Sequence, residues 1–511
     1  MSSHIEKGKF KGDLTKYFLE ATKDLTKLEP FILVLFGASG DLSKRKVMPA
    51  VYNLVVEAIL PKFCLLGVSR RILNNLTFQE TFFDSVIKYS YDTWRIDRWD
   101  ELKHRLYGLS TDFSHKNTFD TLAETIRTID AANNIQGNYF FYLATAPSNY
   151  STIITILQEK GLLSPKSRII IEKPFGLDLK SARNLHKELL AFLAPEQIFK
   201  IDHYLGKESI QNILVFRANN PLFRYIWNKE EIEKVVVLVS ETAGVDKRAE
   251  YFEQTGILRD MVQSHLLQIL ALLTMEIPKQ INPESVKRNK LKLLEAVRKF
   301  SEKDIPLNSV RGQYGPGRLF TERSGDHLVK GYREEFGIDP NSDVETFVAL
   351  RLFIDNEQWM DVPFYLVTGK RMRGRLTEIK IKLREHDSSA IVSEEGRDTG
   401  NIITLRIQPD PSISIQIRWR PPGILSKISP VSLEIANESE SHAEPKAYER
   451  LLLDALLGDR SNFLSQEEIE EQWKIVAPFV DAWKSTPPEG FPNYVAGSDG
   501  PEEIRRLLPD Y

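Results

Sequence analysis

The sequence predicts an α/β protein that combines a doubly wound parallel sheet with a second, larger α+β domain. Three observations support this. Short apolar runs alternate with longer amphipathic segments in the first part of the chain, as in parallel sheets with helical crossovers. A glycine-rich turn follows the first run. Beyond residue 205, apolar and polar residues alternate within the runs, which is typical of antiparallel strands with one exposed face.

The first domain is predicted to be Rossmann-like and to cover residues 31–205, after an N-terminal extension of residues 1–30. Its expected strands are the apolar runs Phe31–Phe36, Phe63–Val68, Tyr139–Ala144 and Arg168–Ile171. The residues between them have the apolar spacing of helices.

The second domain is predicted over residues 206–511, with a mostly antiparallel sheet and a role in substrate binding and oligomerisation. Its expected strands are Val235–Val239, Phe347–Ile354, Ile379–Leu383, Ile402–Ile407 and Ile413–Ile417. Helices are expected at Thr255–Met275 and at Ala447–Leu457, the latter ending at Gly458, a typical C-terminal cap.

Composition excludes several classes of protein. The 511 residues contain 68 Lys and Arg against 71 Asp and Glu, a balance that argues against nucleic acid as a partner. Apolar stretches fall short of the roughly 18 residues of a membrane span, and the charged N-terminus lacks the core of a secretory signal. The single cysteine, Cys64, excludes an intrachain disulfide and fits the cytoplasm.

The turn Gly37-Ala38-Ser39-Gly40-Asp41-Leu42 lies between an expected strand and an expected helix. Glycine allows a close approach of the backbone, and a helix N-terminus attracts anions, so this turn is a candidate phosphate-binding loop. Its candidate cofactor contacts are Gly37, Ser39, Gly40, Asp41 and Leu42. A plain turn is the alternative, since the spacing is G-x-x-G.

Arg70 and Arg71 follow the second expected strand, where an NAD site has an acidic residue for the ribose 2′-hydroxyl. An arginine there would instead pair with a 2′-phosphate, so NADP is the predicted cofactor. A solvated basic turn is the alternative.

Two further segments combine charged and aromatic residues. Lys173 follows the strand at Arg168–Ile171 and precedes a proline, where ligands of open α/β sheets bind. The segment Asp202-His203-Tyr204-Leu205-Gly206-Lys207 offers three donors to a phosphate monoester, namely His203, Tyr204 and Lys207. The alternative for Lys173 is a polar strand end, and the alternative for the segment from Asp202 to Lys207 is a helix cap.

His265 lies in a mostly apolar helical segment, where a hydrogen-bonded core histidine is the usual finding. A carboxylate partner would make it a general base near neutral pH, and the sequence offers Asp202 and Asp260. The nine histidines include no pair three or four residues apart, so no metal is predicted.

In their order along the chain, the motifs resemble those of the glucose-6-phosphate dehydrogenase family. The matching segments, from Phe31 onward, are GASGDLSKRK, LLGVSRR, LATAPSNY, EKPFG, KIDHYLGKES, YFEQTGILRDMVQSH, VPFYLVTGKRM and AYERLLLDALLGD. The resemblance implies oxidation of β-D-glucose 6-phosphate at C1 to 6-phosphoglucono-1,5-lactone, with a hydride passing to NADP⁺. This is the first, oxidative step of the pentose phosphate pathway.

The resemblance also implies roles for residues. His265 would be the base and Asp202 its partner, with His203, Tyr204 and Lys207 on the sugar phosphate. Implied contacts to the sugar are Glu241, Asp260, Lys370 and Arg375, and Lys173 would serve both cofactor and sugar. The family generally forms homodimers or homotetramers.

Three residues depart from the family pattern: Ser264 replaces the usual Asn, Ser43 the usual Ala, and Lys200 the common Arg. Altered rates or packing are the largest effects expected. The region between Lys279 and Asp343 resembles the family less clearly. Two other functions stay open from the sequence: a dehydrogenase of another phosphorylated sugar, and a non-catalytic NADP-binding regulator.

Overall fold

The computed structural model describes residues 28–71, 73–112, 118–321, 325–385, 400–420, 429–436, 447–488 and 490–511, with the single positions 25 and 422. The N-terminal extension therefore lies almost wholly outside the described residues. The chain divides into two compact units, each built from three segments. The first comprises Met1–Glu172, Leu189–Phe199 and Tyr448–Arg460, and the second comprises Lys173–Glu188, Lys200–Ala447 and Ser461–Tyr511.

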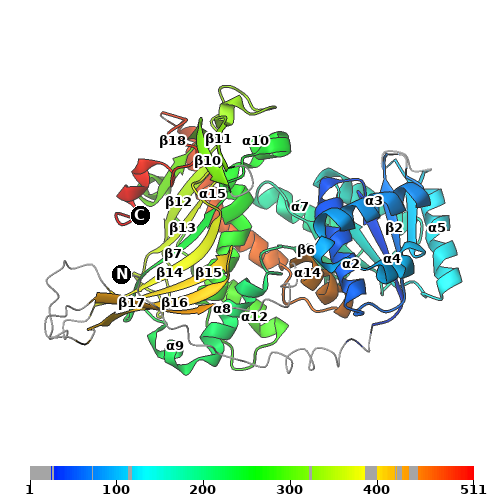
Figure 1. The fold of residues 1–511 in the computed structure, drawn as a ribbon, viewed down its shortest axis with the longest axis horizontal. Coiled ribbons are helices and arrows are strands. Elements are labelled where there is room, and N and C mark those ends of the chain that lie inside the picture. Colours follow the sequence, from blue (N-terminus) through cyan, green and yellow to red (C-terminus); the bar gives the residue numbers. More distant parts are fainter. Residues whose placement is uncertain are drawn as a thin grey trace. The chain divides into compact units, whose positions relative to one another are not determined.

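A parallel sheet forms the centre of the first unit (Figure 1). Within the described residues, six strands follow the order β3-β2-β1-β4-β5-β6. The register pairs β1 in parallel with both β2 and β4, β2 with β3, and β4 with β5. The strands are β1 (Phe31–Phe36), β2 (Phe63–Ser69), β3 (Leu106–Ser110), β4 (Tyr139–Leu143), β5 (Arg168–Glu172) and β6 (Ile198–Ile201). Every residue of β1, β2 and β4 is buried, which explains their continuous apolar sequences.

The helices of this unit connect successive strands, as expected for a doubly wound sheet. They are α2 (Met48–Val56), α3 (Asn75–Tyr89), α4 (Ile96–Lys103), α5 (Thr118–Asn133) and α6 (Tyr150–Glu159). The predicted Rossmann-like fold is confirmed.

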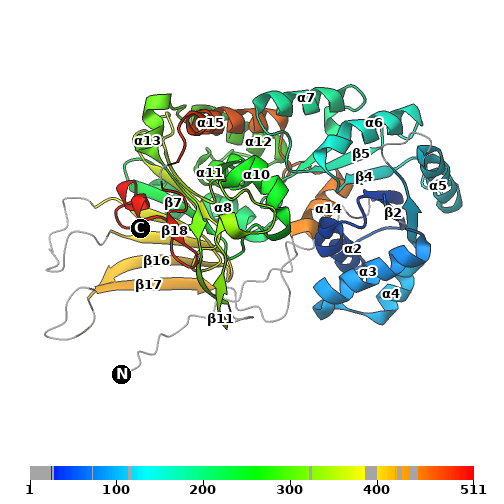
Figure 2. The same cartoon turned by 90° about the horizontal axis from the view of Figure 1, so that it is seen from above.

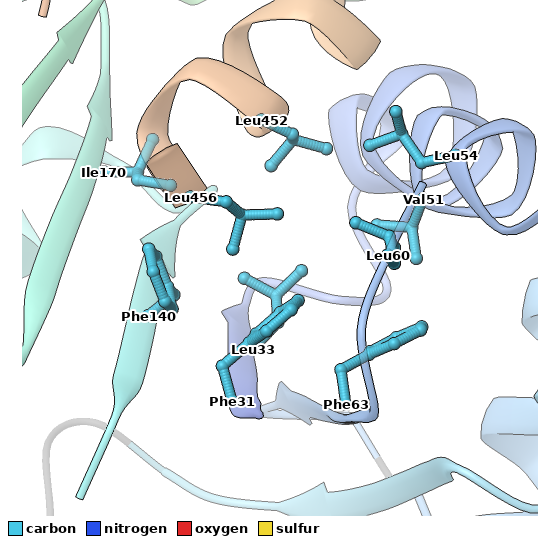
Figure 3. A pocket seen from close by; sticks show the side chains of 10 residues that line it. All are labelled: Phe31, Leu33, Val51, Leu54, Leu60, Phe63, Phe140, Ile170, Leu452 and Leu456. Carbon is cyan, nitrogen blue, oxygen red and sulfur yellow. The ribbon is translucent and has the colours of Figure 1, made fainter. Parts of the chain in front are cut away.

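Helix α14 (Ala447–Leu457) belongs to the first unit, although the sequence placed residues 447–457 with the second domain. Figure 3 shows Leu452 and Leu456 of this helix facing the aromatic side chains of Phe31 and Phe140 across a small apolar hollow. Burial of Leu452 and half-burial of Leu456 against the sheet account for the placement. The helix has the predicted bounds, and Gly458 ends it with φ at +75°.

A second, mixed sheet forms the larger unit. In the part of the chain that the structure describes, its eight strands follow the order β17-β16-β15-β14-β7-β13-β12-β8. Only the β13–β7 pair among these is parallel, so the predicted, mostly antiparallel sheet is confirmed. The strands are β7 (Ile232–Ser240), β8 (Ser309–Gly312), β12 (Phe347–Leu352), β13 (Phe364–Gly369), β14 (Leu376–Leu383), β15 (Ile402–Gln408), β16 (Ser412–Trp419) and β17 (Ser429–Ala436).

Helices gather on one side of this sheet (Figures 1 and 2). They include α8 (Glu208–Asn219), α10 (Ala249–Ile257), α11 (Leu267–Thr274), α12 (Pro283–Ala296) and α15 (Gln466–Ser485). The remaining α-helices and strands of the described residues are α7 (Leu179–Leu190), α9 (Pro221–Ile226), α13 (Ile305–Asn308), β9 (Tyr314–Gly315), β10 (Gly317–Thr321), β11 (Gly325–Val329) and β18 (Tyr494–Val495).

The helix predicted at Thr255–Met275 is three elements in the structure. Helix α10 ends in a kink at Gly256, whose φ is +61°, and is followed by a π-helix, η6 (Leu258–Leu266), and then by α11. A π-helix widens the turn and often marks a functional site. Nearly all of η6 is buried, including the polar residues Asp260, Ser264 and His265. None of the helices in the described residues is long and apolar enough to cross a membrane.

Candidate active site

A histidine and an aspartate form a buried pair at the centre of the candidate site. Nδ1 of His265 lies 2.5 Å from Oδ1 of Asp202, although the two residues are 63 positions apart. Asp202 is fully buried and His265 is 3% exposed. Asp202 enters the site because it immediately follows the buried strand β6, whereas His265 projects from η6. Of the two carboxylates that the sequence offered, Asp202 is the partner of His265.

Every oxygen of the Asp202 carboxylate has a hydrogen-bond donor. Oδ1 also accepts from the backbone N–H of Tyr204, at 3.0 Å, and Oδ2 accepts from the hydroxyl of Ser264. The Tyr204 ring stacks on the His265 ring with centroids 4.4 Å apart. The carboxylate and the imidazole are therefore fixed in position before any ligand binds.

The pKa values describe an anion beside a neutral ring. Burial alone would raise the pKa of Asp202, but His265 and Lys173 hold it below its usual range. Burial and the charge of Lys173 lower the pKa of His265, and Asp202 only partly opposes them. An anionic Asp202 accepts a hydrogen bond from the Nδ1–H of His265, so Nε2 carries the lone pair. Nε2 lies 3.4 Å from Nζ of Lys173, which also donates to the backbone oxygen of Asp260 at 2.6 Å.

A second group of charges surrounds Asp260. Nζ of Lys370 is 2.7 Å from Glu241 Oε2 and 3.9 Å from Asp260 Oδ2. Arg248 lies 3.3 Å from Asp260 Oδ1. Burial opposes ionisation, yet Lys370 and Arg248 hold the pKa of Asp260 below its usual range. Two anionic carboxylates and an ammonium thus face one another, as acceptors and a donor suited to hydroxyl groups.

Basic and aromatic residues form a third group at the start of α8. Lys207 precedes this helix, and its Nζ lies 4.1 Å from the centroid of the Tyr204 ring and 2.9 Å from Gln408 Oε1. Arg375 reaches the same Gln408 oxygen at 3.5 Å. His203 packs edge-on against His265, with centroids 4.6 Å apart. Gln408 thereby joins Lys207 to Arg375, residues distant in the sequence.

Asp202, His203 and His265 offer ligand atoms within 4.8 Å of one another, which the spacing of the histidines could not reveal. Both oxygens of Asp202 are already engaged by His265, Ser264 and the Tyr204 amide. We therefore interpret the cluster as a hydrogen-bonded dyad.

The glycine turn of the first unit is tightly packed and is followed directly by a helical segment. Gly37 follows β1 with φ at +81°, and a Cβ there would lie 2.2 Å from the backbone oxygen of Ala144. Only glycine fits between these neighbouring strand ends. The helical segment begins at Asp41, directly after Gly40, and so presents its N-terminus at this turn.

Arg70 lies beside that turn. It is exposed and follows the last residue of β2, Ser69, whose hydroxyl is 2.6 Å from the hydroxyl of Ser39 in the glycine turn. The register places Phe36 of β1 opposite Val68 of β2. The glycines, the helix start and the exposed Arg70 after β2 fit a dinucleotide with a 2′-phosphate.

Comparison with known proteins decides the family. The model of the glucose-6-phosphate dehydrogenase NAD binding domain matches residues 34–212, and that of the C-terminal domain matches residues 214–511. The chain belongs to the glucose-6-phosphate dehydrogenase family. As a member it is an oxidoreductase that acts on glucose 6-phosphate at C1 with NADP as cofactor, in the first step of the pentose phosphate pathway.

Relatives of this glucose-6-phosphate dehydrogenase family match over nearly the whole chain. The glucose-6-phosphate 1-dehydrogenase of Chlamydia muridarum is 39% identical over 493 residues, which cover 94% of this chain and 95% of the relative. That of Bacillus subtilis is 36% identical over 482 residues, covering 93% and 96%. A solved glucose-6-phosphate dehydrogenase in complex with its substrate glucose-6-phosphate has a TM-score of 0.82 at 32% identity, covering 94% of this chain and 97% of that one.

The three departures from the family pattern all make hydrogen bonds. Ser264 donates to Asp202, Ser43 donates to the backbone oxygen of Gly37 at 2.9 Å, and Lys200 donates to Gln466 at 2.6 Å. Ser264 thus contacts the dyad directly, more closely than the sequence indicated.

Sequence reasoning missed two side chains of the site. Arg248 pairs with Asp260 and lies three residues before the motif YFEQTGILRDMVQSH. A basic residue next to a motif was the only local signal for it. Gln408 ends β15, and no local signal marks a glutamine as the link between two basic residues.

Proposed function

We propose that His265 is the general base of this dehydrogenase and that Asp202 holds it in place and stabilises its protonated form. The buried 2.5 Å contact between Nδ1 and Asp202 carries this proposal, because it leaves Nε2 as the acceptor. Nε2 takes the proton of the C1 hydroxyl while the C1–H bond breaks and its electron pair leaves as hydride. Bound NADP⁺ supplies the hydride acceptor. Asp202 stabilises the imidazolium that forms.

Lys173 supports this step through its charge. Its ammonium lies near Nε2, so it keeps the base neutral until the substrate arrives. We also propose that Lys173 contacts both sugar and cofactor.

We propose that the other two groups of the site bind the sugar phosphate at its two ends. His203, Tyr204 and Lys207 bind the phosphate, assisted by Arg375. Glu241, Asp260 and Lys370 bind the sugar hydroxyls, since their donors and acceptors already face one another. Binding of the phosphate, remote from C1, positions the reacting carbon and contributes to catalysis.

Cofactor binding is proposed for residues 31–205, which supply the phosphate loop Gly37, Ser39, Gly40, Asp41 and Leu42. Arg70 would contact the 2′-phosphate of NADP and so select it over NAD. The substrate-binding and oligomerisation roles of residues 206–511 are likewise proposed.

We propose that the enzyme is a cytoplasmic homodimer or homotetramer. The outer strands of the large sheet carry an apolar face, with the pairs Ile413↔Ile435, Ile415↔Leu433 and Ile417↔Val431. Leu433 is 54% and Ile435 64% exposed, and such a surface is typical of a subunit contact. Sedimentation velocity would measure the assembly, and a monomer at micromolar concentration would contradict it.

The decisive test follows NADP⁺ reduction at 340 nm with glucose 6-phosphate, galactose 6-phosphate and glucose. We expect strong preference for glucose 6-phosphate. His265→Asn should retain NADP⁺ binding and lose kcat by several orders of magnitude, about 10³-fold or more, since it removes the base. Near-normal turnover of this variant would exclude His265, and a faster reaction with another sugar phosphate would overturn the substrate.

A further inference from the structure

Glu345, which no motif singled out, contacts the first turn of the helix that carries the dyad. It precedes β12 by two residues, and its Oε1 accepts a hydrogen bond from the backbone N–H of Leu258 at 3.1 Å. Its backbone oxygen accepts from the N–H of Ile257, also at 3.1 Å. Leu258 is the first residue of η6, on which Asp260 and His265 lie. Glu345 therefore caps this helix from a distant part of the chain.

The contact is so close that it dictates the residue at position 256. Gly256 has φ at +61°, and a Cβ there would lie 2.2 Å from Oε1 of Glu345. Any side chain would displace the carboxylate and strain the backbone. The kink between α10 and η6 thus brings the start of η6 directly onto Glu345.

The neighbouring residue fixes a second part of the site. The backbone oxygen of Thr346 accepts from the N–H of Lys370 at 2.9 Å. Tyr494, near the C-terminus, donates to the backbone oxygen of Lys370 at 2.7 Å and lies 2.9 Å from Oγ1 of Thr346. The dipeptide Glu345-Thr346 consequently holds both the helix with Asp260 and the loop with Lys370.

Burial raises the pKa of Glu345, and the Leu258 N–H and the nearby Arg259 and Arg311 only partly oppose that rise. A carboxyl oxygen accepts the hydrogen bond of the Leu258 N–H whether the group is ionised or protonated, so the cap does not require the charge.

We propose that Glu345 is a positioning residue for the dehydrogenase reaction. It sets the location of η6, and with it Asp260 and His265, relative to Lys370. The separation between Lys370 Nζ and Asp260 Oδ2, 3.9 Å, depends on this support. The proposal rests on the sugar-binding and catalytic roles proposed above for Asp260, His265 and Lys370.

The test compares Glu345→Ala, Glu345→Asp and Glu345→Gln in the full-length enzyme. Glu345→Ala removes the acceptor, and we expect kcat/KM for glucose 6-phosphate to fall about 10- to 100-fold, as expected when reacting groups shift by about 1 Å. Both a higher KM for the sugar phosphate and a lower kcat are expected, at unchanged KM for NADP⁺. Glu345→Gln keeps an acceptor oxygen and should recover most of the activity.

A matched control removes a helix cap elsewhere. Asn282 caps α12 by accepting from the Ser285 N–H at 2.9 Å, so Asn282→Ala should lower the melting temperature without changing the KM for glucose 6-phosphate. If Glu345→Ala likewise lowers only the melting temperature and leaves the KM for glucose 6-phosphate unchanged, the proposal is overturned. It is also overturned if Glu345→Gln is as impaired in kcat/KM as Glu345→Ala. If Glu345→Ala does not fold, Glu345→Asp replaces it in the test, because it moves the acceptor oxygen by one methylene. A higher KM for glucose 6-phosphate in this variant would support the positioning role, and an unchanged KM would overturn it.

An inactive wild-type enzyme would instead refute the proposed function. Active wild type with unchanged Glu345 variants would refute only the positioning role.

Discussion

Replacing Asp202 by Asn tests the central pair most directly, because it removes one charge and keeps the shape. Oδ1 of Asp202 accepts from both the Tyr204 N–H and Nδ1 of His265, so an asparagine would keep its amide oxygen there and turn its NH₂ toward Ser264. The ring would keep its proton on Nδ1 but lose the negative charge that stabilises the imidazolium.

The expected loss in kcat is about 10²- to 10³-fold, because losing one charge of a buried pair removes about 3–4 kcal/mol of transition-state stabilisation. NADP⁺ reduction at saturating glucose 6-phosphate measures it, and fluorescence titration checks that NADP⁺ still binds. Asp454→Asn, at a carboxylate buried in the first unit and paired with Arg450, is the matched control and should change kcat less than twofold. An Asp202→Asn enzyme that keeps more than a tenth of its kcat would refute the charge-stabilising role of Asp202.

Two other predictions concern the cofactor and the pH profile. Arg70→Ala should weaken NADP⁺ binding about 10- to 100-fold, because the lost contact is charge-assisted, and leave NAD⁺ nearly unaffected; isothermal titration with both cofactors checks this, and equal losses would contradict the 2′-phosphate contact. Burial and Lys173 lower the pKa of His265, so the base stays neutral as pH falls below 6.5, and the acidic limb of kcat/KM should lie below that value. Lys173→Met, which removes the opposing charge, should move the limb to higher pH; a wild-type limb above 6.5 would contradict the reasoning.

Much of the fold follows from short-range patterns in the sequence. The runs Phe31–Phe36 and Phe63–Val68 are buried strands because a continuous apolar segment between turn residues has no exposed face. Gly37 lies in the turn where its spacing placed it, since only glycine adopts the required φ there without a clash. At such positions the residue type and its sequence neighbours are enough to predict the local structure.

Helix α14 illustrates what local patterns leave open. Its bounds and its glycine end were predictable, but its apolar face is compatible with any apolar surface. Leu452 and Leu456 pack in the first unit, beside strands from the opposite end of the chain. No property of residues 447–457 selects that partner.

The sequence by itself determined the class of the fold, the position of the glycine turn and the chemical types present in the site. Tertiary structure decided which of them meet. The tertiary structure paired His265 with Asp202, whereas Asp260 forms ion pairs with Lys370 and Arg248. It also brought Gln408 and Glu345 to residues far along the chain. The physical reason is that hydrogen bonds and ion pairs act over a few ångströms, and only the packing of strands and helices brings distant residues within that range.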